Sequence, residues 1–202
     1  MRRIVLAMTG AACLLIVAGA AFLLSQQTPE RPAPAAALNI GGADIGGPFT
    51  LVDHTGEERT SASLIQGPTL LYFGYTYCPD VCPIDTQVMV DIVDVLDEKG
   101  IQATPVFITV DPARDDVESM AIYAEIMHPK MIAMTGSDDQ IATAAKAYKA
   151  YYQRVETDSA ADYLMNHSAY LYLVDPDGLQ AMYRRGFAPE EIAEDIAWVL
   201  DR

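Results

Sequence analysis

The stretch TLLYFGYTYCPDVCPID, residues 69–85, runs from an apolar segment through two cysteines into an amphipathic segment. Thr69 to Tyr75 is almost continuously apolar or aromatic, which is typical of a strand buried on both faces. Pro83 to Glu98 has the composition of a helix that stops at Gly100, and its apolar stripe is predicted to be Ile84, Val88, Ile92 and Val95. The cysteines therefore lie between a buried strand and a helix, where open α/β sheets usually carry their chemistry.

Outward from this stretch, strand and helix patterns alternate. Strands are expected at residues 49–53, 58–60, 104–110, 131–134, 151–156, 169–175 and 180–184, and helices at 115–127, 138–149 and 189–200. The turn Pro176-Asp177-Gly178 separates the last two strands and predicts an antiparallel hairpin. The pattern predicts an α/β fold with a mixed central sheet flanked by helices.

The chain has 202 residues, enough for one self-sufficient domain, and begins with an uncharged apolar run from Ile4 to Leu24. Such a run is long enough for a single transmembrane helix. A cleaved signal peptide is the alternative, but the apolar run continues past its candidate cleavage site at residues 18–20. Arg2 and Arg3 orient the N-terminus toward the cytoplasm, so the domain is expected outside the cytoplasmic membrane. Cys13 is interpreted as a small apolar residue of this helix.

Composition divides the chain into three parts. Residues 1–25 are the expected membrane anchor, residues 26–40 a linker rich in proline and alanine, and residues 41–202 the folded domain. Beyond Arg2 and Arg3 the chain carries 11 Lys and Arg against 28 Asp and Glu. This acidic balance repels nucleic acid and anionic lipid, which excludes a nucleic-acid-binding protein.

Three interpretations apply to Cys78 and Cys82, namely a structural disulfide, a redox dithiol or half of a metal site. If Cys82 caps a helix that starts at Pro83, the helix dipole favours the thiolate form of both cysteines. A disulfide that closes so small a loop stabilises a fold little. Redox dithiols usually have two intervening residues. The three residues here let both sulfurs present outward, as a chelate for a soft cation such as Cu(I).

A metal site needs a further ligand, and the chain offers three histidines. His54 is expected in a turn and His128 at a helix end, where histidines are ordinary. His167 stands before an apolar strand that should lie near the first buried strand. Beside two thiolates, His167 is the predicted third ligand.

The segments GYTYCPDVCP, ITVDPARD and NHSAYLYLVDPDG, in this order behind one N-terminal anchor, resemble the Sco/SenC family of thioredoxin-fold copper proteins. The resemblance extends from about Gly46 to Leu200. It implies a thioredoxin-like domain that binds one copper ion, Cu(I) or Cu(II), through Cys78, Cys82 and His167, with the cysteines also able to form a reversible disulfide. It further implies delivery of copper to the dinuclear copper site of cytochrome oxidase.

The resemblance also implies partners and a location. The partners are the copper-site subunit of the oxidase and other periplasmic copper carriers, and the location is the bacterial inner membrane with the domain facing the periplasm. Two positions depart from the family pattern, Tyr77 in place of a histidine and Asn166 in place of an aspartate. Neither change removes a ligand, but the second alters what orients the imidazole.

Several neighbours receive supporting roles. Asp80 is assigned to docking or helix electrostatics, and Asp111 is expected to shape the same face in a pair with Arg114. Tyrosines expected to pack around the site are Tyr75, Tyr77, Tyr163 and Tyr170. Methionines interpreted as core residues, because separate elements carry them, are Met127, Met131, Met134 and Met165.

Three functions fit these features: a non-enzymatic copper metallochaperone, a thiol-disulfide oxidoreductase that keeps oxidase or copper-carrier cysteines reduced, and a copper or redox sensor. Thioredoxin-like reductases usually place a cis-proline before the strand that faces their dithiol. This chain has Asn166-His167-Ser168 there. A ligand in place of a substrate clamp favours the metallochaperone, with reductase activity as an accessory.

Overall fold

The computed structural model describes residues 37–38, 42, 44–157 and 163–201. The expected anchor, with Cys13, and most of the expected linker lie outside the described residues. Every described residue belongs to one compact unit, Pro34–Arg202. No helix in this described part is both long and apolar enough to cross a bilayer.

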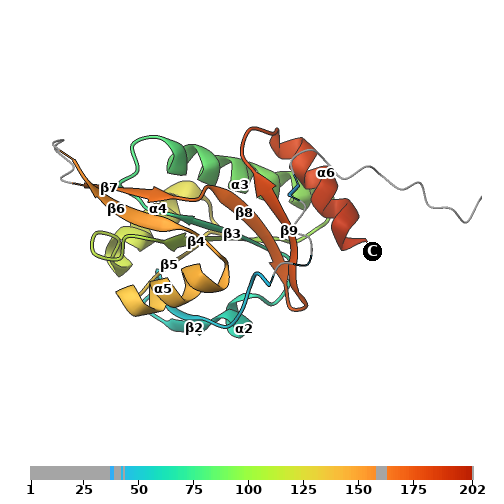
Figure 1. Cartoon of the computed structure of the whole chain (residues 1–202). Coiled ribbons are helices and arrows are strands. Elements are labelled where there is room, and N and C mark those ends of the chain that lie inside the picture. The colour runs from blue at the N-terminus through green and yellow to red at the C-terminus, as the bar shows by residue number, and fades with distance from the viewer. Residues whose placement is uncertain (1–36, 39–41, 43, 158–162, 202) are drawn as a thin grey trace, which may run out of the picture. The chain divides into compact units, whose positions relative to one another are not determined.

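A seven-stranded mixed sheet forms the centre of the domain (Figure 1). Its strands, from edge to edge, are β2 (Glu58–Thr60), β1 (Thr50–Asp53), β5 (Ile132–Thr135), β4 (Thr104–Thr109), β3 (Thr69–Gly74), β8 (Tyr170–Asp175) and β9 (Gly178–Arg184). Strands β3, β4 and β5 run parallel, while β8 lies antiparallel to β3 and forms a hairpin with β9. The predicted mixed sheet is confirmed.

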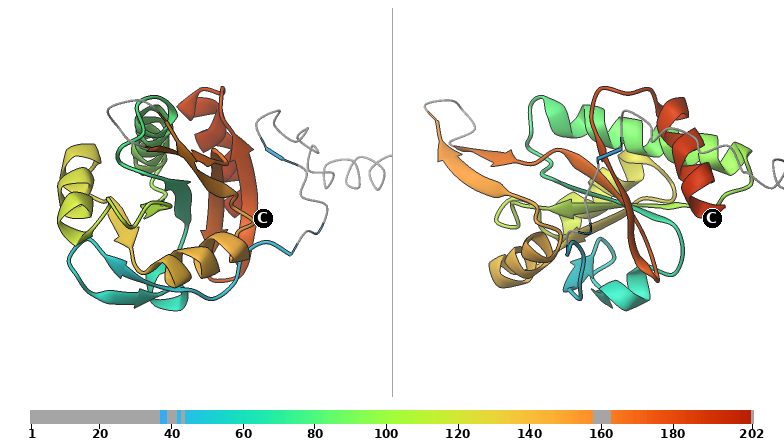
Figure 2. Two further views of the ribbon diagram at one scale, coloured as in Figure 1. Left: turned by 60° about the vertical axis from the view of Figure 1, so that its left-hand side comes forward. Right: turned by 45° about the vertical axis from the view of Figure 1, so that its right-hand side comes forward.

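Helices cover both faces of the sheet (Figure 2). They are α2 (Ser61–Leu64), α3 (Val81–Glu98), α4 (Val117–Met127), α5 (Asp138–Ala147) and α6 (Pro189–Leu200). The first face carries α3, α4 and α6, and Tyr123 of α4 packs there against Phe107 with ring centroids 4.6 Å apart. The opposite face carries α5 and α2, where Tyr148 contacts Phe73 and Tyr172. This layering buries the central strands on both sides.

Strand β3 carries the chain from the core to the cysteine loop. All six of its residues are buried, as the apolar run predicted. A Cβ atom on its last residue, Gly74, would stand 2.8 Å from the Tyr72 ring and 2.9 Å from the Phe107 ring. Because Cβ atoms essentially never approach other atoms so closely, only glycine fits where β3 passes into the loop.

A second, two-stranded sheet projects from the domain beside β8 (Figure 1). It pairs β6 (Tyr152–Glu156) with β7 (Tyr163–His167), with Tyr152 opposite His167. Strand β7 was not predicted. His167 therefore ends a strand of its own, and residues 168 and 169 connect it to β8. The expected proximity of this segment to the first buried strand is confirmed, because β8 pairs with β3.

Helix α3 differs from the prediction in its start and in its buried face. It begins at Val81, so Asp80 is the N-cap and Cys82 lies inside the first turn. Pro83 is its third residue, still among the first-turn positions whose N–H groups have no partner within a helix. The buried residues of α3 are Cys82, Thr86, Met89, Val90, Ile92, Val93 and Leu96. Of the predicted stripe, Ile92 is buried and Val88 and Val95 pack partly buried against the core, whereas Ile84 is 54% exposed. The prediction was wrong at Ile84, and it left out the buried thiol and hydroxyl because it counted only apolar residues.

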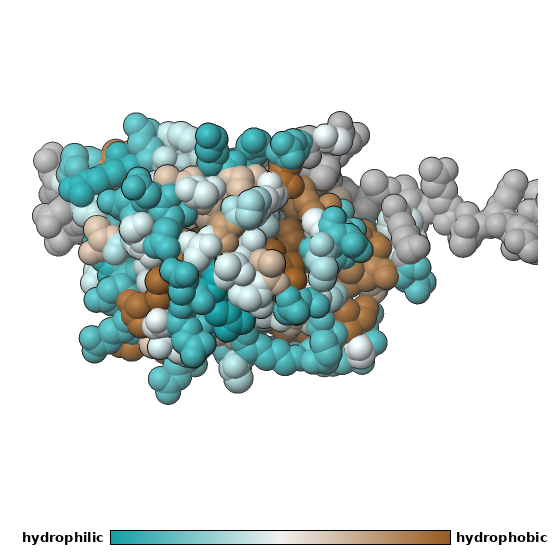
Figure 3. All heavy atoms as spheres, turned by 90° about the horizontal axis from the view of Figure 1, so that it is seen from below, coloured by the Kyte–Doolittle hydropathy of each residue, from teal (hydrophilic) through white to brown (hydrophobic). Residues whose placement is uncertain are grey.

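The face formed by α5, α2 and β2 is mainly hydrophilic, with apolar residues in separate small patches (Figure 3). Ala37 and Leu38, at the end of the expected linker, pair with β9 at the sheet edge. The Leu38 amide donates to the Met182 carbonyl at 2.8 Å. The described chain thus enters the domain along β9.

Candidate metal centre

The cysteine loop runs from the end of β3 into the first turn of α3. The backbone amide of Cys78 donates to the carbonyl of Tyr75 at 3.3 Å, and the amide of Cys82 donates to the Cys78 sulfur at 3.4 Å. Both cysteines are free, with Cys82 fully buried and Cys78 9% exposed. An amide in the first turn of α3 thus donates to the Cys78 sulfur, which agrees with the thiolate predicted at Cys78. The thiolate predicted at Cys82 was wrong, because the Cys78 side chain and burial raise the pKa of Cys82.

A buried carboxylate fixes the base of this loop. Asp115 is fully buried and accepts hydrogen bonds from the Thr76 amide at 3.0 Å, from the Thr76 hydroxyl and from the Thr109 hydroxyl at 2.6 Å. Burial raises the pKa of the Asp115 carboxyl, and these hydrogen bonds oppose the shift. Sequence reasoning missed Asp115, although a second acid close after Asp111 in VDPARD was a signal.

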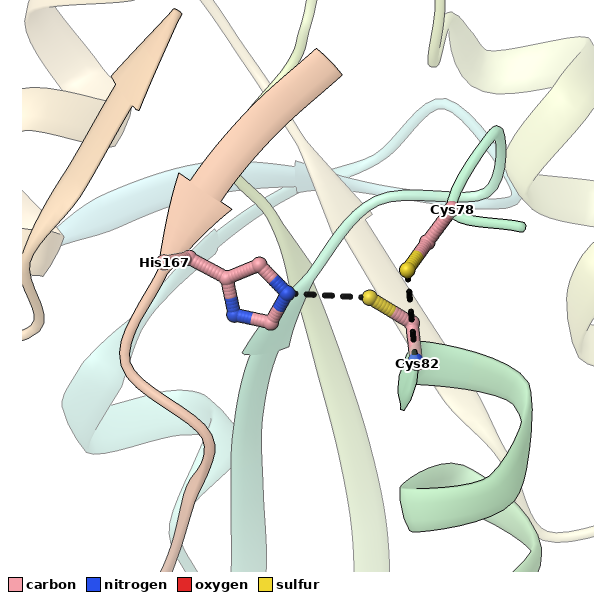
Figure 4. Close-up of side chains that lie close together, drawn as sticks. All are labelled: Cys78, Cys82 and His167. Carbon is pink, nitrogen blue, oxygen red and sulfur yellow. Dashed lines mark hydrogen bonds between the residues drawn. The ribbon is translucent and has the colours of Figure 1, made fainter. Parts of the chain in front are cut away.

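His167 reaches the cysteines from the end of β7 (Figure 4). Its Nε2 atom lies 3.0 Å from the Cys82 sulfur, and its Nδ1 atom lies 3.2 Å from the carbonyl oxygen of Ser168. Since a carbonyl oxygen only accepts, Nδ1 carries the ring proton, and Nε2 is the nitrogen that faces the Cys82 sulfur. One donor atom from each of Cys78, Cys82 and His167 falls within 4.8 Å of the others.

The neighbour that orients the imidazole is a backbone group. Asn166, which replaces the family's aspartate, is exposed and lies opposite Gln153 in the β6–β7 ladder. The hydrogen bond that sets the His167 tautomer goes to the Ser168 carbonyl. The loss of a carboxylate at position 166 therefore leaves the ligand nitrogen Nε2 facing the sulfurs.

The two thiols have opposite electrostatic environments. A hydrogen bond from the neighbouring Cys82 thiol lowers the pKa of Cys78, against the opposing effect of burial. The Cys78 side chain and burial raise the pKa of Cys82. One sulfur is thus held as a thiolate and the other as a thiol, so the pair shares one proton before a cation binds.

Two tyrosine rings enclose the imidazole. Tyr72 and Tyr75 stand perpendicular to the His167 ring, with centroids 6.0 and 5.9 Å away. Burial raises the pKa of Tyr75 to about 12. The Tyr72 hydroxyl donates to Asp85 at 3.0 Å, and Asp85 pairs with Arg185 at 3.1 Å. Tyr72 and Asp85 were not predicted as site residues, since their contacts join elements far apart in sequence.

Arg114 links three segments around the centre. Its guanidinium lies over the rings of Tyr163, Tyr77 and Tyr75, at 3.7, 4.9 and 5.7 Å from their centroids. It pairs with Asp111, as predicted, and Asp111 also accepts from the Tyr163 hydroxyl at 2.8 Å. The cluster includes Tyr75 and Tyr77 of the cysteine loop, Asp111 and Arg114 of the loop after β4, and Tyr163 of strand β7. It therefore connects the loop that carries the two cysteines with the strand that carries His167.

Other predicted neighbours divide into packed and exposed groups. Tyr75 and Tyr163 are buried as expected and Tyr170 is partly buried, whereas Tyr77 is 57% exposed. Asp80 is exposed and makes no side-chain capping hydrogen bond to α3. Methionines 131, 134 and 165 lie in the core, and Met127 packs against it.

The remaining two histidines are engaged elsewhere. His54 Nδ1 accepts from the Ala133 amide at 3.3 Å, and His128 contacts Asp94 at 3.2 Å and accepts from the Lys130 amide. The structure therefore places His167, and neither of these two, with the cysteines.

Comparison with known proteins gives a consistent result. The family model described as SCO1/SenC matches residues 38–201. The chain is 42% identical to the protein SenC of Rhodobacter capsulatus over 200 residues, which cover 96% of this chain and 90% of SenC. The crystal structure of Arabidopsis thaliana ScoI with copper bound superposes with a TM-score of 0.75 at 34% identity, covering 78% of this chain and 98% of ScoI. The structure of Bradyrhizobium japonicum ScoI with copper bound superposes with a TM-score of 0.69 at 36% identity, covering 77% of this chain and 99% of that ScoI.

Proposed function

The chain belongs to the SCO1/SenC family, and from this membership we propose that it is a copper metallochaperone. It binds one copper ion through Cys78, Cys82 and His167 and passes the ion to the dinuclear copper site of cytochrome oxidase. The observation that carries the proposal is the cluster of two sulfurs and one imidazole nitrogen within 4.8 Å. Copper-bound relatives with the same fold support it.

The donor set suits the cargo. Thiolates are soft ligands that favour Cu(I), and imidazole is a good ligand for both Cu(I) and Cu(II). Cys78 is already favoured as a thiolate, while the Cys82 thiol must release its proton when the ion binds. His167 offers Nε2 without a tautomer change, because the Ser168 carbonyl holds the proton on Nδ1. Transfer then consists of replacing these three donors one at a time by those of the recipient.

A thiol-disulfide oxidoreductase is the second candidate, and the thiol asymmetry favours it. A partly accessible thiolate beside a buried thiol is the arrangement of a reducing dithiol. Cys78 would attack a partner disulfide, and Cys82 would then release the reduced partner. The protein's two thiols become one disulfide as the partner disulfide becomes two thiols.

The N-terminal part completes the proposal. Residues 1–25 anchor the protein in the bacterial inner membrane as a single helix, residues 26–40 form a linker, and residues 41–202 present the copper site in the periplasm. Support comes from the uncharged run Ile4 to Leu24, which follows two arginines. The partners that this location offers are the oxidase copper-site subunit and periplasmic copper carriers.

The test is a titration of the reduced protein with Cu(I) and Cu(II), followed by absorption and electron paramagnetic resonance spectroscopy. We expect one equivalent of copper, thiolate-to-Cu(II) charge-transfer bands, and nitrogen coupling from one imidazole. His167→Ala should lose the nitrogen coupling and bind Cu(II) more weakly while its thiols still oxidise. Cys78→Ser should lose tight binding of both ions.

His128→Ala is the matched control, because His128 lies outside the cluster and contacts an exposed acid. It should bind like the wild type. Unchanged Cu(II) binding and spectra in His167→Ala would rule out the three-ligand site. Copper delivery lost in His167→Ala with disulfide reduction retained would separate the two candidate functions.

A further inference from the structure

A chain of three polar side chains runs behind the metal centre, from strand β3 through helix α3 to the residue that follows β9. The Tyr72 hydroxyl donates to Oδ2 of Asp85 at 3.0 Å, and Nε of Arg185 pairs with the other oxygen, Oδ1, at 3.1 Å. Tyr72 is fully buried and the Asp85 side chain is 10% exposed, whereas the Arg185 side chain is 46% exposed. The carboxylate is therefore turned toward the interior, with its counter-ion on the solvent side.

These partners hold Asp85 as a carboxylate. Burial raises the pKa of the Asp85 carboxyl, and the hydrogen bond from Tyr72 and the charge of Arg185 oppose that shift. Both groups that face its oxygens can donate, which suits an ionised carboxyl that only accepts. A negative charge is thus fixed below the surface, where salt screens it much less than at the surface.

The Tyr72–Asp85 pair lies beside the candidate ligands. Asp85 follows Cys82 by three residues on α3, and side chains at this spacing are neighbours on a helix surface. The Tyr72 ring stands perpendicular to the His167 ring, with centroids 6.0 Å apart. The Tyr72 hydroxyl also neighbours the Cys82 sulfur, where it opposes the rise in pKa that the Cys78 side chain and burial cause in the Cys82 thiol.

The Tyr72 hydroxyl has one hydrogen and two acceptors in reach, the Asp85 carboxylate and the Cys82 sulfur. It donates to Asp85. While Asp85 is a carboxylate, it therefore keeps this hydrogen bond away from the sulfur. A hydrogen bond to a metal-bound thiolate withdraws electron density from the sulfur and favours the lower oxidation state of copper, because hydrogen bonding around a ligand sulfur tunes the potential of copper–thiolate centres.

The charge of Asp85 acts in the same direction. With two thiolates and one neutral imidazole, a Cu(I) centre carries one negative charge, whereas a Cu(II) centre is neutral. A carboxylate nearby repels the negative centre and does not repel the neutral one, so it favours Cu(II). Arg185 weakens this repulsion from the solvent side of the carboxylate.

We propose that Asp85 sets the preference of this site for Cu(II) over Cu(I), by keeping the Tyr72 hydrogen bond from the Cys82 sulfur and by adding a negative charge. Arg185 limits the preference by partly neutralising that charge. The proposal rests on the proposed function, since it concerns the oxidation state of the copper that the site holds. Asp85 acts through Tyr72 and through space, so it is a positioning residue and not a ligand.

The test measures the Cu(II) and Cu(I) affinities of the full-length, reduced protein in mild detergent without oxygen, each by competition with a chelator of known affinity. The quantity compared is the ratio of the two affinities, which a general loss of binding leaves unchanged. Asp85→Asn should shift this ratio about tenfold toward Cu(I), the order of magnitude for one charge several ångströms away at an intermediate dielectric constant. The reduction potential of bound copper should rise accordingly, by about 59 mV.

Three more variants sharpen the result. Arg185→Gln should shift the ratio the opposite way, toward Cu(II), and because it changes a half-exposed side chain it tests the proposal even if Asp85→Asn does not fold. Tyr72→Phe added to Asp85→Asn should return part of the shift, since no hydroxyl is left to turn toward the sulfur. The matched control is Asp94→Asn, which removes the same charge from an exposed position near the other end of α3 and should keep the wild-type ratio.

The outcomes that contradict this proposal differ from those that contradict the proposed function. A wild-type ratio in Asp85→Asn would overturn the proposal, and so would equal losses of both affinities in that variant. A shift of the same sign in Asp85→Asn and Arg185→Gln would also overturn it, because a structural disturbance and not a charge would then be the cause. A wild-type protein that binds neither ion would contradict the proposed function before any ratio is measured.

Discussion

At the scale of single residues, groups outside the candidate ligand set hold the centre in place. The Ser168 carbonyl sets the His167 tautomer. Asp115 holds Thr76 at the base of the loop. Because these contacts hold the candidate ligands close together, copper binding should cost little reorganisation.

The unequal thiols predict unequal reactivity. An ordinary thiol has a pKa near 8.5, so its alkylation rate rises about tenfold per pH unit below neutrality. Cys78, with its lowered pKa, should be alkylated by iodoacetamide at a rate that stays nearly flat from pH 6 to pH 8, while Cys82 should react only after unfolding. Mass spectrometry of peptides from the reduced, metal-free protein measures both rates.

Cys82→Ser supplies the comparison. A serine hydroxyl still donates to the Cys78 sulfur, so this variant should keep the flat pH dependence, whereas Cys82→Ala removes the donor, moves the pKa of Cys78 toward the ordinary value and should steepen the pH dependence. A Cys78 rate in the wild-type protein that follows the ordinary tenfold rise would contradict the assigned asymmetry.

At the scale of elements, the β6–β7 hairpin must be held against the cysteine loop, because it lies outside the central sheet. Arg114 supplies this link. It stacks on Tyr163 of β7 and on Tyr75 and Tyr77 of the loop. Arg154 lies 3.7 Å from the same Tyr163 ring, and two guanidinium groups at that distance must occupy opposite faces of it. Of these two guanidinium groups, that of Arg114 also lies over tyrosine rings of the cysteine loop.

Arg114→Lys is therefore expected to loosen His167 while the fold survives. A lysine keeps the charge but loses the planar stacking and the forked hydrogen bonds to Asp111 and the Tyr163 carbonyl. Cu(II) affinity should fall about 10- to 100-fold, as for groups that orient metal ligands, and the nitrogen coupling should weaken. Cu(I) binding by the two thiolates should change less.

Arg154→Lys is the matched control, since Arg154 is 54% exposed and contacts the far face of Tyr163. Its Cu(II) spectrum should equal that of the wild type. Equal losses in Arg114→Lys and Arg154→Lys would show that the hairpin is held as a whole and not through the Arg114 contacts.

Elements with strong local patterns were predictable. Strands β3 and β4 are continuous apolar runs, and α6 matches its predicted bounds because Pro189 and the periodicity after it are local signals. Strand β7 was missed because its ladder partner, β6, and not its own composition, defines it. The buried face of α3 was predicted only in part, because Cys82 and Thr86 also face inward, next to His167 and the Tyr123 hydroxyl. Asp115 was not predicted as a structural support of the loop, because the threonines that donate to it belong to other segments.

At the scale of the whole molecule, the candidate ligands bridge the domain. Cys82 and His167 lie 85 positions apart in the chain. A ligand that binds only the folded state stabilises it by RT ln(1 + [L]/Kd), or about 4 kcal/mol at a thousand times Kd. Copper should therefore raise the thermal unfolding midpoint of the reduced protein.

Variants separate this stabilisation from the stability of the metal-free fold. His167→Ala should unfold near the wild-type midpoint without metal and show a smaller shift with Cu(II), while His128→Ala should keep the full shift. Differential scanning calorimetry measures both. The same Cu(II) shift in His167→Ala and the wild type would mean that His167 adds nothing to binding.

The distance along the chain between the two sources of ligands also governs when the site can exist during synthesis. A chain that has been made only through α3 possesses both thiols, but it lacks the β7 strand and the imidazole at its end. Nor has it β8, which must pair with β3 before residue 167 can reach the loop. The complete three-donor site therefore forms only after β7 and β8 have been synthesised and folded. Copper binding through all three donors would thus occur only in the completely folded domain.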